Sequence, residues 1–194
     1  MNLIQRAQGI LTAPAKEWAT IKTEKTPVQT LFLSYAVPLA AITAVAQFIG
    51  LGLFSRWWGV GRGLGYAVLY YVLGLAMVFG VGFVINALAP NFGSKQSLEN
   101  AMALAVYSMT PSWVVGALYL IPAWYIMVWL VWLASLYGLY ILYLGFTAPL
   151  MDTPKDKQLS YFIISLIVAI VGIALIQVIV RSIFIPRIAR FVIP

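Results

Sequence analysis

Long stretches without charge alternate with short polar segments along the chain, and the longest of them covers residues 100–151. A single helix over these 52 residues would extend about 78 Å at about 1.5 Å per residue, whereas the hydrocarbon core of a bilayer is about 30 Å thick. This stretch therefore predicts two membrane crossings. We expect the turn between them at Pro122, because proline removes a backbone donor and disfavours a helical conformation in the residue before it.

Three further stretches predict one crossing each. Residues 26–55 and 63–94 contain no Asp, Glu, Lys or Arg, and residues 159–185 contain only Arg181. The fold class that follows is all-α, a polytopic membrane protein with five transmembrane helices. Because the connection between the third and fourth spans is short, we expect these two helices to pack against each other as an antiparallel pair.

Helix starts can be placed from local patterns. Thr26 precedes Pro27, and Gln29 follows three residues after the threonine, which is the arrangement of a capping box at a helix N-terminus. Ser97, with Glu99 in the next turn, predicts the start of the third span.

The first 25 residues differ in pattern from the rest of the chain. Apolar residues recur at helical spacing over residues 3–11, and Pro14 and Trp18 predict a second short helix with Trp18 as an anchor at the membrane surface. We therefore divide the chain into an N-terminal interfacial segment, residues 1–25, and a five-helix bundle, residues 26–194. We expect the N-terminal segment to lie on the membrane and to contribute little to the stability of the bundle.

Four glycines follow the first span at alternate positions: Gly59, Gly61, Gly63 and Gly65. A phosphate-binding loop would need a preceding strand and the lysine-serine ending of a P-loop, and both are missing here. The glycines therefore predict a flexible turn at the membrane interface.

Composition supports an integral membrane protein. Hydrophobic residues make up 63% of the chain and charged residues only 9%, whereas soluble domains contain about 25% charged residues. The net charge of +7 comes from basic residues spread over terminal and connecting segments, which favours anionic lipid headgroups over nucleic acid as their partner.

The residues needed for most catalytic chemistry are missing from the predicted spans. The chain has no histidine and no cysteine, and its five acidic residues all fall in terminal or connecting segments. No proton relay or acid-base pair can therefore be placed within the membrane, so we expect neither an enzyme nor an ion-coupled transporter, and no cofactor or metal.

The third span contains the densest group of uncharged polar residues, around Pro111. This proline frees the backbone carbonyl of Tyr107, which neighbouring hydroxyls can bind, so we expect a kink at mid-membrane. Such residues either hydrogen-bond between helices or line a path for a polar solute. The candidates for helix packing or recognition in the spans are Asn86, Tyr107, Pro111, Trp113, Tyr137, Gly138 and Tyr140.

Four segments of the chain together resemble the bacterial branch of the Yip family, the Ypt/Rab-interacting membrane proteins. They are residues 14–18, 86–93, 107–113 and 137–140, and the tyrosine-serine-x-x-proline element at Tyr107 is the most specific of them. The resemblance implies a five-helix membrane bundle with a cytosolic N-terminus. Eukaryotic members bind Rab-type GTPases through a long N-terminal region, and because only about 25 residues precede the first span here, we do not carry that activity over.

The function expected from these observations is that of a non-enzymatic membrane organiser or adaptor. Its partners would be membrane lipids and either other membrane proteins or a second copy of itself, with no nucleic acid. The alternative is a small transporter or channel for an uncharged or weakly polar solute.

The distribution of basic residues bears on orientation. With the N-terminus in the cytoplasm, seven basic residues lie on the inner side and five on the outer, which favours a multi-pass protein of the inner membrane with a cytoplasmic N-terminus. Residues expected to dock the N-terminal segment on the membrane surface are Arg6, Lys16, Trp18, Lys22 and Lys25.

Overall fold

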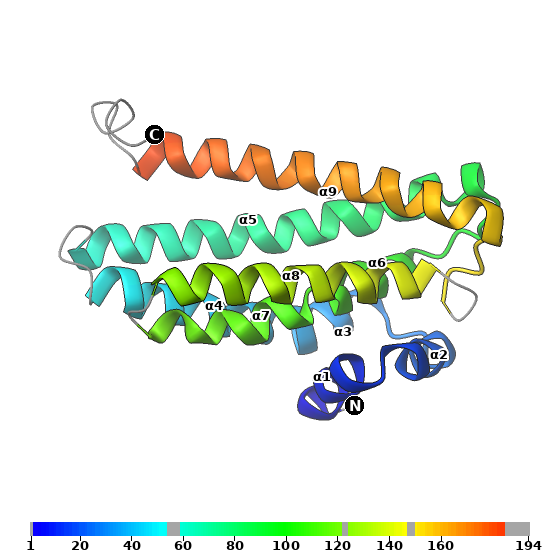
Figure 1. Ribbon diagram of the computed structural model, residues 1–194, viewed down its shortest axis with the longest axis horizontal. Helices are drawn as coiled ribbons and strands as arrows, with labels where there is room; N and C mark the ends of the chain where they lie inside the picture. Colours follow the sequence, from blue (N-terminus) through cyan, green and yellow to red (C-terminus); the bar gives the residue numbers. More distant parts are fainter. Residues whose placement is uncertain (1, 54–58, 122–123, 147–149, 185–194) are drawn as a thin grey trace.

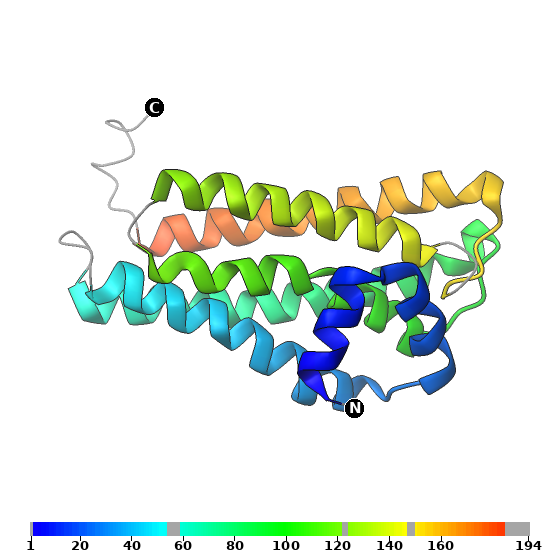
Figure 2. The same cartoon turned by 60° about the horizontal axis from the view of Figure 1, so that its bottom comes forward.

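The computed structural model describes residues 2–53, 59–121, 124–146 and 150–184, and within these ranges the secondary structure is entirely helical. Long helices run side by side along the longest axis of the molecule, while two short helices, α1 and α2, lie against one end (Figures 1 and 2). Five segments of the described chain are long and apolar enough to cross a membrane, which confirms the predicted fold class. They are Val28–Gly50, Gly59–Phe92, Leu98–Leu120, Trp129–Phe146 and Lys155–Phe184.

The N-terminal segment forms two helices, as predicted: α1 (Leu3–Thr12) and α2 (Pro14–Glu24). The side chain of Asn2 accepts a hydrogen bond from the backbone N–H of Ile4 and so caps α1. Pro14 occupies the first position of α2, where its missing N–H costs nothing.

The first span alternates between α- and π-helix. It is built of α3 (Val28–Leu31), a π-helical turn (Phe32–Ala36), α4 (Val37–Gln47) and a second π-helical segment (Phe48–Leu53). The predicted capping box is wrong. Pro27, with φ of −56° and ψ of 142°, itself occupies the N-cap position and no side chain caps the helix, so Thr26 lies outside it.

The second span is one long helix, α5 (Gly59–Leu88), which continues into a 3-10 turn (Ala89–Phe92). The glycine-rich stretch is therefore helical from Gly59 onward, so the predicted flexible turn is wrong and the helix begins four residues before the predicted span. In an apolar environment the backbone must satisfy its own hydrogen bonds, and this outweighs the low helix propensity of glycine. Gly93, at φ of 70°, ends the span in the left-handed conformation that glycine adopts without strain.

The third span begins as predicted, with Ser97 capping α6 (Leu98–Ser108) by accepting a hydrogen bond from the N–H of Asn100. It continues as α7 (Thr110–Gly116) and a 3-10 turn (Ala117–Leu120). The fourth and fifth spans are α8 (Trp124–Phe146) and α9 (Lys155–Phe184). Pro122, the predicted turn residue, lies outside the described residues, but α8 begins within the predicted fourth span.

Helices α6 and α7 occupy the middle of the bundle. Helix α5 packs against α6 on one side and α9 on the other, while α4 and α8 both contact α7. The direct contact of α8 with α6 and α7 confirms the predicted pairing of the third and fourth spans. Every residue of α6 from Ala101 to Ser108 is buried.

Gly138 shows how closely α8 approaches α6. A Cβ atom at Gly138 would lie 2.7 Å from the backbone oxygen of Ser108, which is closer than real Cβ contacts allow. Glycine at this position thus permits the two helices to meet backbone to backbone.

Candidate functional site

The break between α6 and α7 lies at Met109, two residues before Pro111. The hydroxyl of Thr110 donates to the carbonyl of Tyr107 over 2.7 Å, and the hydroxyl of Ser108 donates to the carbonyl of Leu104 over 2.7 Å. The carbonyl that Pro111 frees is therefore bound by a neighbouring side chain, as the sequence suggested.

Tyr35 connects the first span to this break. Its hydroxyl lies 2.8 Å from the hydroxyl of Thr110, and its ring packs edge-on against the ring of Tyr107 with 4.7 Å between centroids. Tyr35 and Thr110 are both almost completely buried. The break is consequently a closed, hydrogen-bonded cluster inside the protein.

The N-terminal hairpin, α1 with α2, covers this cluster. Ile10, Trp18 and Ile21 are buried in the same core as Tyr107. The indole N–H of Trp18 donates to the carbonyl of Ile141 in α8 over 3.1 Å, and the Trp18 ring meets that of Tyr107 edge-on at 6.2 Å. The hairpin is thus packed into the protein, whereas we expected a segment that lies on the membrane and contributes little to the stability of the bundle.

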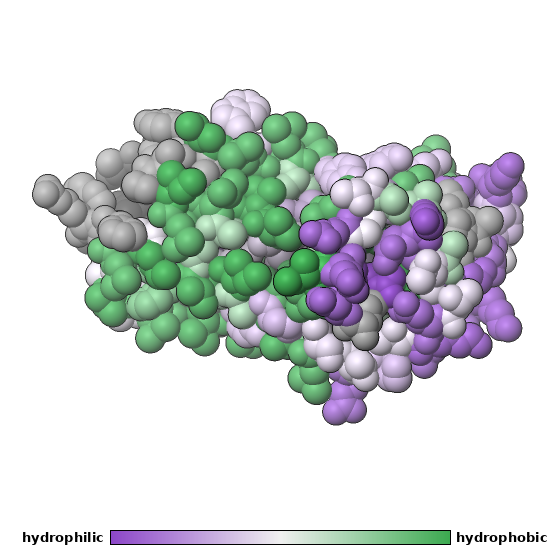
Figure 3. Space-filling model, turned by 90° about the horizontal axis from the view of Figure 1, so that it is seen from below, coloured by the Kyte–Doolittle hydropathy of each residue, from purple (hydrophilic) through white to green (hydrophobic). Residues whose placement is uncertain are grey.

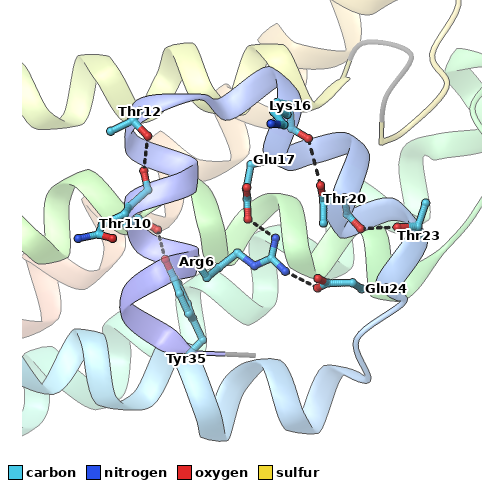
Figure 4. A network of polar contacts seen from close by, with 10 residues as sticks. Arg6, Thr12, Lys16, Glu17, Thr20, Thr23, Glu24, Tyr35 and Thr110 are labelled. Atoms are coloured by element: carbon cyan, nitrogen blue, oxygen red, sulfur yellow. Dashed lines mark hydrogen bonds and ion pairs between the residues drawn. The ribbon is translucent and has the colours of Figure 1, made fainter.

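Arg6 is the most unusual residue of the hairpin, because its side chain is charged yet only 3% of the residue is exposed. Its guanidinium forms ion pairs with Glu17 and Glu24, both from α2 (Figure 4), and lies 5.8 Å from the centroid of the Tyr107 ring. Two carboxylates and an aromatic face offset the cost of removing the guanidinium from water.

Two of the five residues predicted to dock on the membrane surface are instead buried inside the protein. Arg6 and Trp18 are buried in the protein and cannot reach lipid headgroups, because Arg6 is held by α2 and Trp18 by α8. Lys16 and Lys25 are exposed. Lys22 is half-buried, and its ammonium donates hydrogen bonds of 2.6 Å to both carboxylate oxygens of Asp152.

The ion pairs of Arg6 with Glu17 and Glu24 were not predicted from the sequence. The signal was present: the two glutamates are seven residues apart, which places them on one face of α2, and Arg6 is the single charged residue of the apolar α1. Their pairing depends on the turn at Ala13, which folds α2 back along α1.

Five of the seven predicted packing residues differ in how far they are buried. Tyr107, Pro111 and Trp113 are buried at the break, whereas Tyr137 is half-buried and donates from its hydroxyl to the carbonyl of Leu11 over 2.6 Å. Tyr140 is 52% exposed and stacks on Tyr137, so its side chain lies on the outside of the bundle rather than in a helix contact.

Asn86 lies on α5, apart from the hydrogen-bonded cluster at the break. Its backbone carbonyl accepts a hydrogen bond from the side chain of Gln96 over 3.3 Å, while its side-chain oxygen is buried without a partner among the described residues. The structure thus does not join Asn86 to Tyr107 and Thr110 in one site.

A groove with a volume of about 360 Å³ lies on the side of the bundle between α4 and the end of the third span. Its walls are almost entirely apolar and include small side chains from both helices. The lining includes Ala41, Ile42 and Val45 of α4 and Ala117 of the third span. Among the described residues, no group of three or more His, Cys, Asp or Glu side chains could hold a metal ion.

Residues 9–176 match the Yip1 domain. The chain is 31% identical over 130 residues to the inner membrane protein YohC of Escherichia coli K12, an alignment that covers 63% of this chain and 65% of that protein. The same values hold for YohC of Escherichia coli O6:H1, strain CFT073. The chain thus spans just under two thirds of the length of these relatives. No solved structure matches it.

Proposed function

The chain belongs to the Yip family, and on that premise we propose that it is a non-enzymatic organiser or adaptor of the inner membrane that associates laterally with other membrane proteins or with itself. The name of its relative YohC supports the inner membrane as its location. In the first, second, fourth and fifth spans no more than 33% of the most apolar window is buried, which leaves apolar helix surface for such association.

The observation that carries this proposal is the apolar groove on α4. Pro38, Ala41 and Val45 lie on one side of it and Ala117 on the other, so a helix entering the groove could approach both backbones closely. Its lining lacks the convergent polar groups that bind and orient a small substrate. This arrangement fits a neighbouring transmembrane helix better than a polar solute.

The buried hydroxyls of the third span also favour the adaptor over a transporter of a polar solute. Transport of a polar solute through the break would require hydroxyls that face an open path, but Thr110 is fully buried and its hydroxyl contacts both Tyr35 and the carbonyl of Tyr107. Ser108 is bound to the carbonyl of Leu104 in the same way. These hydroxyls are thus engaged within the third span or with Tyr35 of the first span, which supports a role in packing over a role in transport.

We place the N-terminal hairpin on the cytoplasmic side, on the basis of the seven-to-five distribution of basic residues. A reporter fused after Pro194 tests this orientation. With five spans the reporter lies in the periplasm, and a cytoplasmic reporter would overturn the orientation or the number of crossings.

Lateral association can be tested with a photo-crosslinking amino acid placed in native membranes. At Ile42 or Val45, in the groove, we expect specific crosslinked products, whereas at Ile170, equally exposed on α9, we expect only lipid adducts. Equal crosslinking at the groove and at Ile170 would contradict the groove as the contact surface. Absence of any protein product from either position would contradict the adaptor function.

A further inference from the structure

The two ends of the bundle carry different kinds of charge. All five acidic residues lie at the end with the N-terminal hairpin, in α2, in the first turns of α6 and α9, and at Asp152. Hydrophilic residues gather at that end of the surface in Figure 3. The three ion pairs among the described residues are there as well.

At the opposite end, α5 begins and α9 ends, and each helix contributes an exposed arginine: Arg62 and Arg181. Arg62 donates to the backbone carbonyl of Phe184 over 2.5 Å, which ties its guanidinium to the last turn of α9. A guanidinium has five N–H donors, so this bond leaves Arg62 with donors for a further acceptor.

Arg181 lies near the same place. The ring of Phe184 packs edge-on against the ring of Tyr66, with 5.8 Å between centroids, and Arg181 is close enough to Tyr66 to interact with it electrostatically. Arg62 thus contacts Phe184, Phe184 contacts Tyr66, and Tyr66 lies near Arg181, so the two arginines belong to one group of neighbouring residues. Neither arginine forms an ion pair with a carboxylate in the part of the chain that the structure describes.

From this juxtaposition we propose that Arg62 and Arg181 bind the phosphate of an anionic phospholipid, in the leaflet opposite the N-terminal hairpin. Two guanidiniums on adjacent helices suit a phosphate, because each can donate two parallel hydrogen bonds to its oxygens. The anchoring of Arg62 on Phe184 reduces the freedom that this side chain loses on binding.

The surface beside Arg181 suits the rest of a lipid molecule. On α9, Val178 is 65% exposed and Ala174 is also exposed, and both lie on the face of Arg181, three and seven residues before it. Acyl chains can lie along these side chains while the phosphate meets the guanidiniums. A free phosphate ion would gain only the polar part of this site.

The test is a lipid titration of the full chain in detergent, followed by native mass spectrometry. We expect the wild type to bind phosphatidylglycerol more tightly than phosphatidylethanolamine. Arg62→Gln with Arg181→Gln should weaken the first bound phosphatidylglycerol about tenfold or more, since each basic residue near an anionic headgroup contributes on the order of a fivefold gain in affinity. Inorganic phosphate at millimolar concentration should not displace the lipid.

The matched control is Lys95→Gln with Lys155→Gln, which removes the same charge from exposed residues at the other end. It should leave binding within about twofold of wild type, because screening limits its influence over that distance. Equal weakening by both double variants, or by neither, would overturn the site, and displacement by phosphate would assign it to a free anion. Should the arginine double variant fail to fold, Arg181→Gln alone tests the proposal, since Arg181 forms no hydrogen bond among the described residues.

Discussion

The third and fifth spans show opposite relations between hydropathy and burial. The third span has a mean hydropathy of 1.4, and 67% of its most apolar window is buried, whereas α9 has a mean hydropathy of 3.0 and only 11% is buried. The most hydrophobic span is therefore the least buried one. Inside the bundle, small and polar residues such as Ala103, Ala105 and Thr110 allow close helix contact and interhelical hydrogen bonds.

The largest expected effect of this difference in burial is on tryptophan, because Trp18 is fully buried and Trp129 is 72% exposed. Trp18→Ala should destabilise the protein by about 3–5 kcal/mol, since it removes a fully buried ring and its bond to Ile141. Trp129→Ala, at a residue 72% exposed, should change stability by less than about 0.5 kcal/mol. Thermal unfolding in detergent measures both. Equal effects would mean that the N-terminal hairpin is not part of the packed core.

Glycine gives a second, smaller contrast. Gly138→Val should destabilise by about 1–3 kcal/mol, because a side chain there meets the backbone of Ser108 and forces α8 away from α6. Gly80→Val carries the same change in helix propensity at a position with no atom within 4 Å, and should be nearly neutral. The same unfolding assay applies, and a neutral Gly138→Val would contradict the backbone contact.

A third prediction concerns the hydroxyls at the break. Thr110→Val keeps the shape of the side chain but removes its bonds to Tyr35 and Tyr107, at an expected cost of about 1 kcal/mol. Ser135→Ala removes an exposed hydroxyl whose hydrogen bond within the described ranges goes to the carbonyl of Val131, and it should have no measurable effect. If Thr110→Val left the stability unchanged, the hydrogen bonds of Thr110 to Tyr35 and Tyr107 would not stabilise the break.

The sequence predicted the spans because length and absence of charge suffice to define them. It also predicted the break near Pro111, since proline acts on its own helix and the Tyr107 carbonyl that it frees lies only four residues away. Both properties are local. The helical glycines after Gly59 were missed because their conformation is decided by the apolar surroundings, which local propensity does not include.

The contacts of the N-terminal hairpin were missed for a different reason. Arg6 is neutralised by Glu17 and Glu24 only after α2 folds back on α1, and Trp18 is bonded to Ile141, 123 residues further along the chain. Amphipathic spacing shows that α1 has an apolar face, but the same face fits a membrane surface or a protein core equally well. The choice between the two depends on the long-range partners.

The most direct test of the central claim, that the third span forms a dry core while α9 faces lipid, is paramagnetic broadening of backbone amide NMR signals in micelles. We predict that residues 101–108 are protected from both a water-soluble gadolinium chelate and a micelle-dissolved nitroxide, because all of them are buried. Signals on the exposed face of α9, such as those of Ile163, Ile170 and Val178, should be broadened by the nitroxide alone. Broadening of the Ser108 or Thr110 signal by the gadolinium chelate would reveal an aqueous path through the bundle and contradict the account.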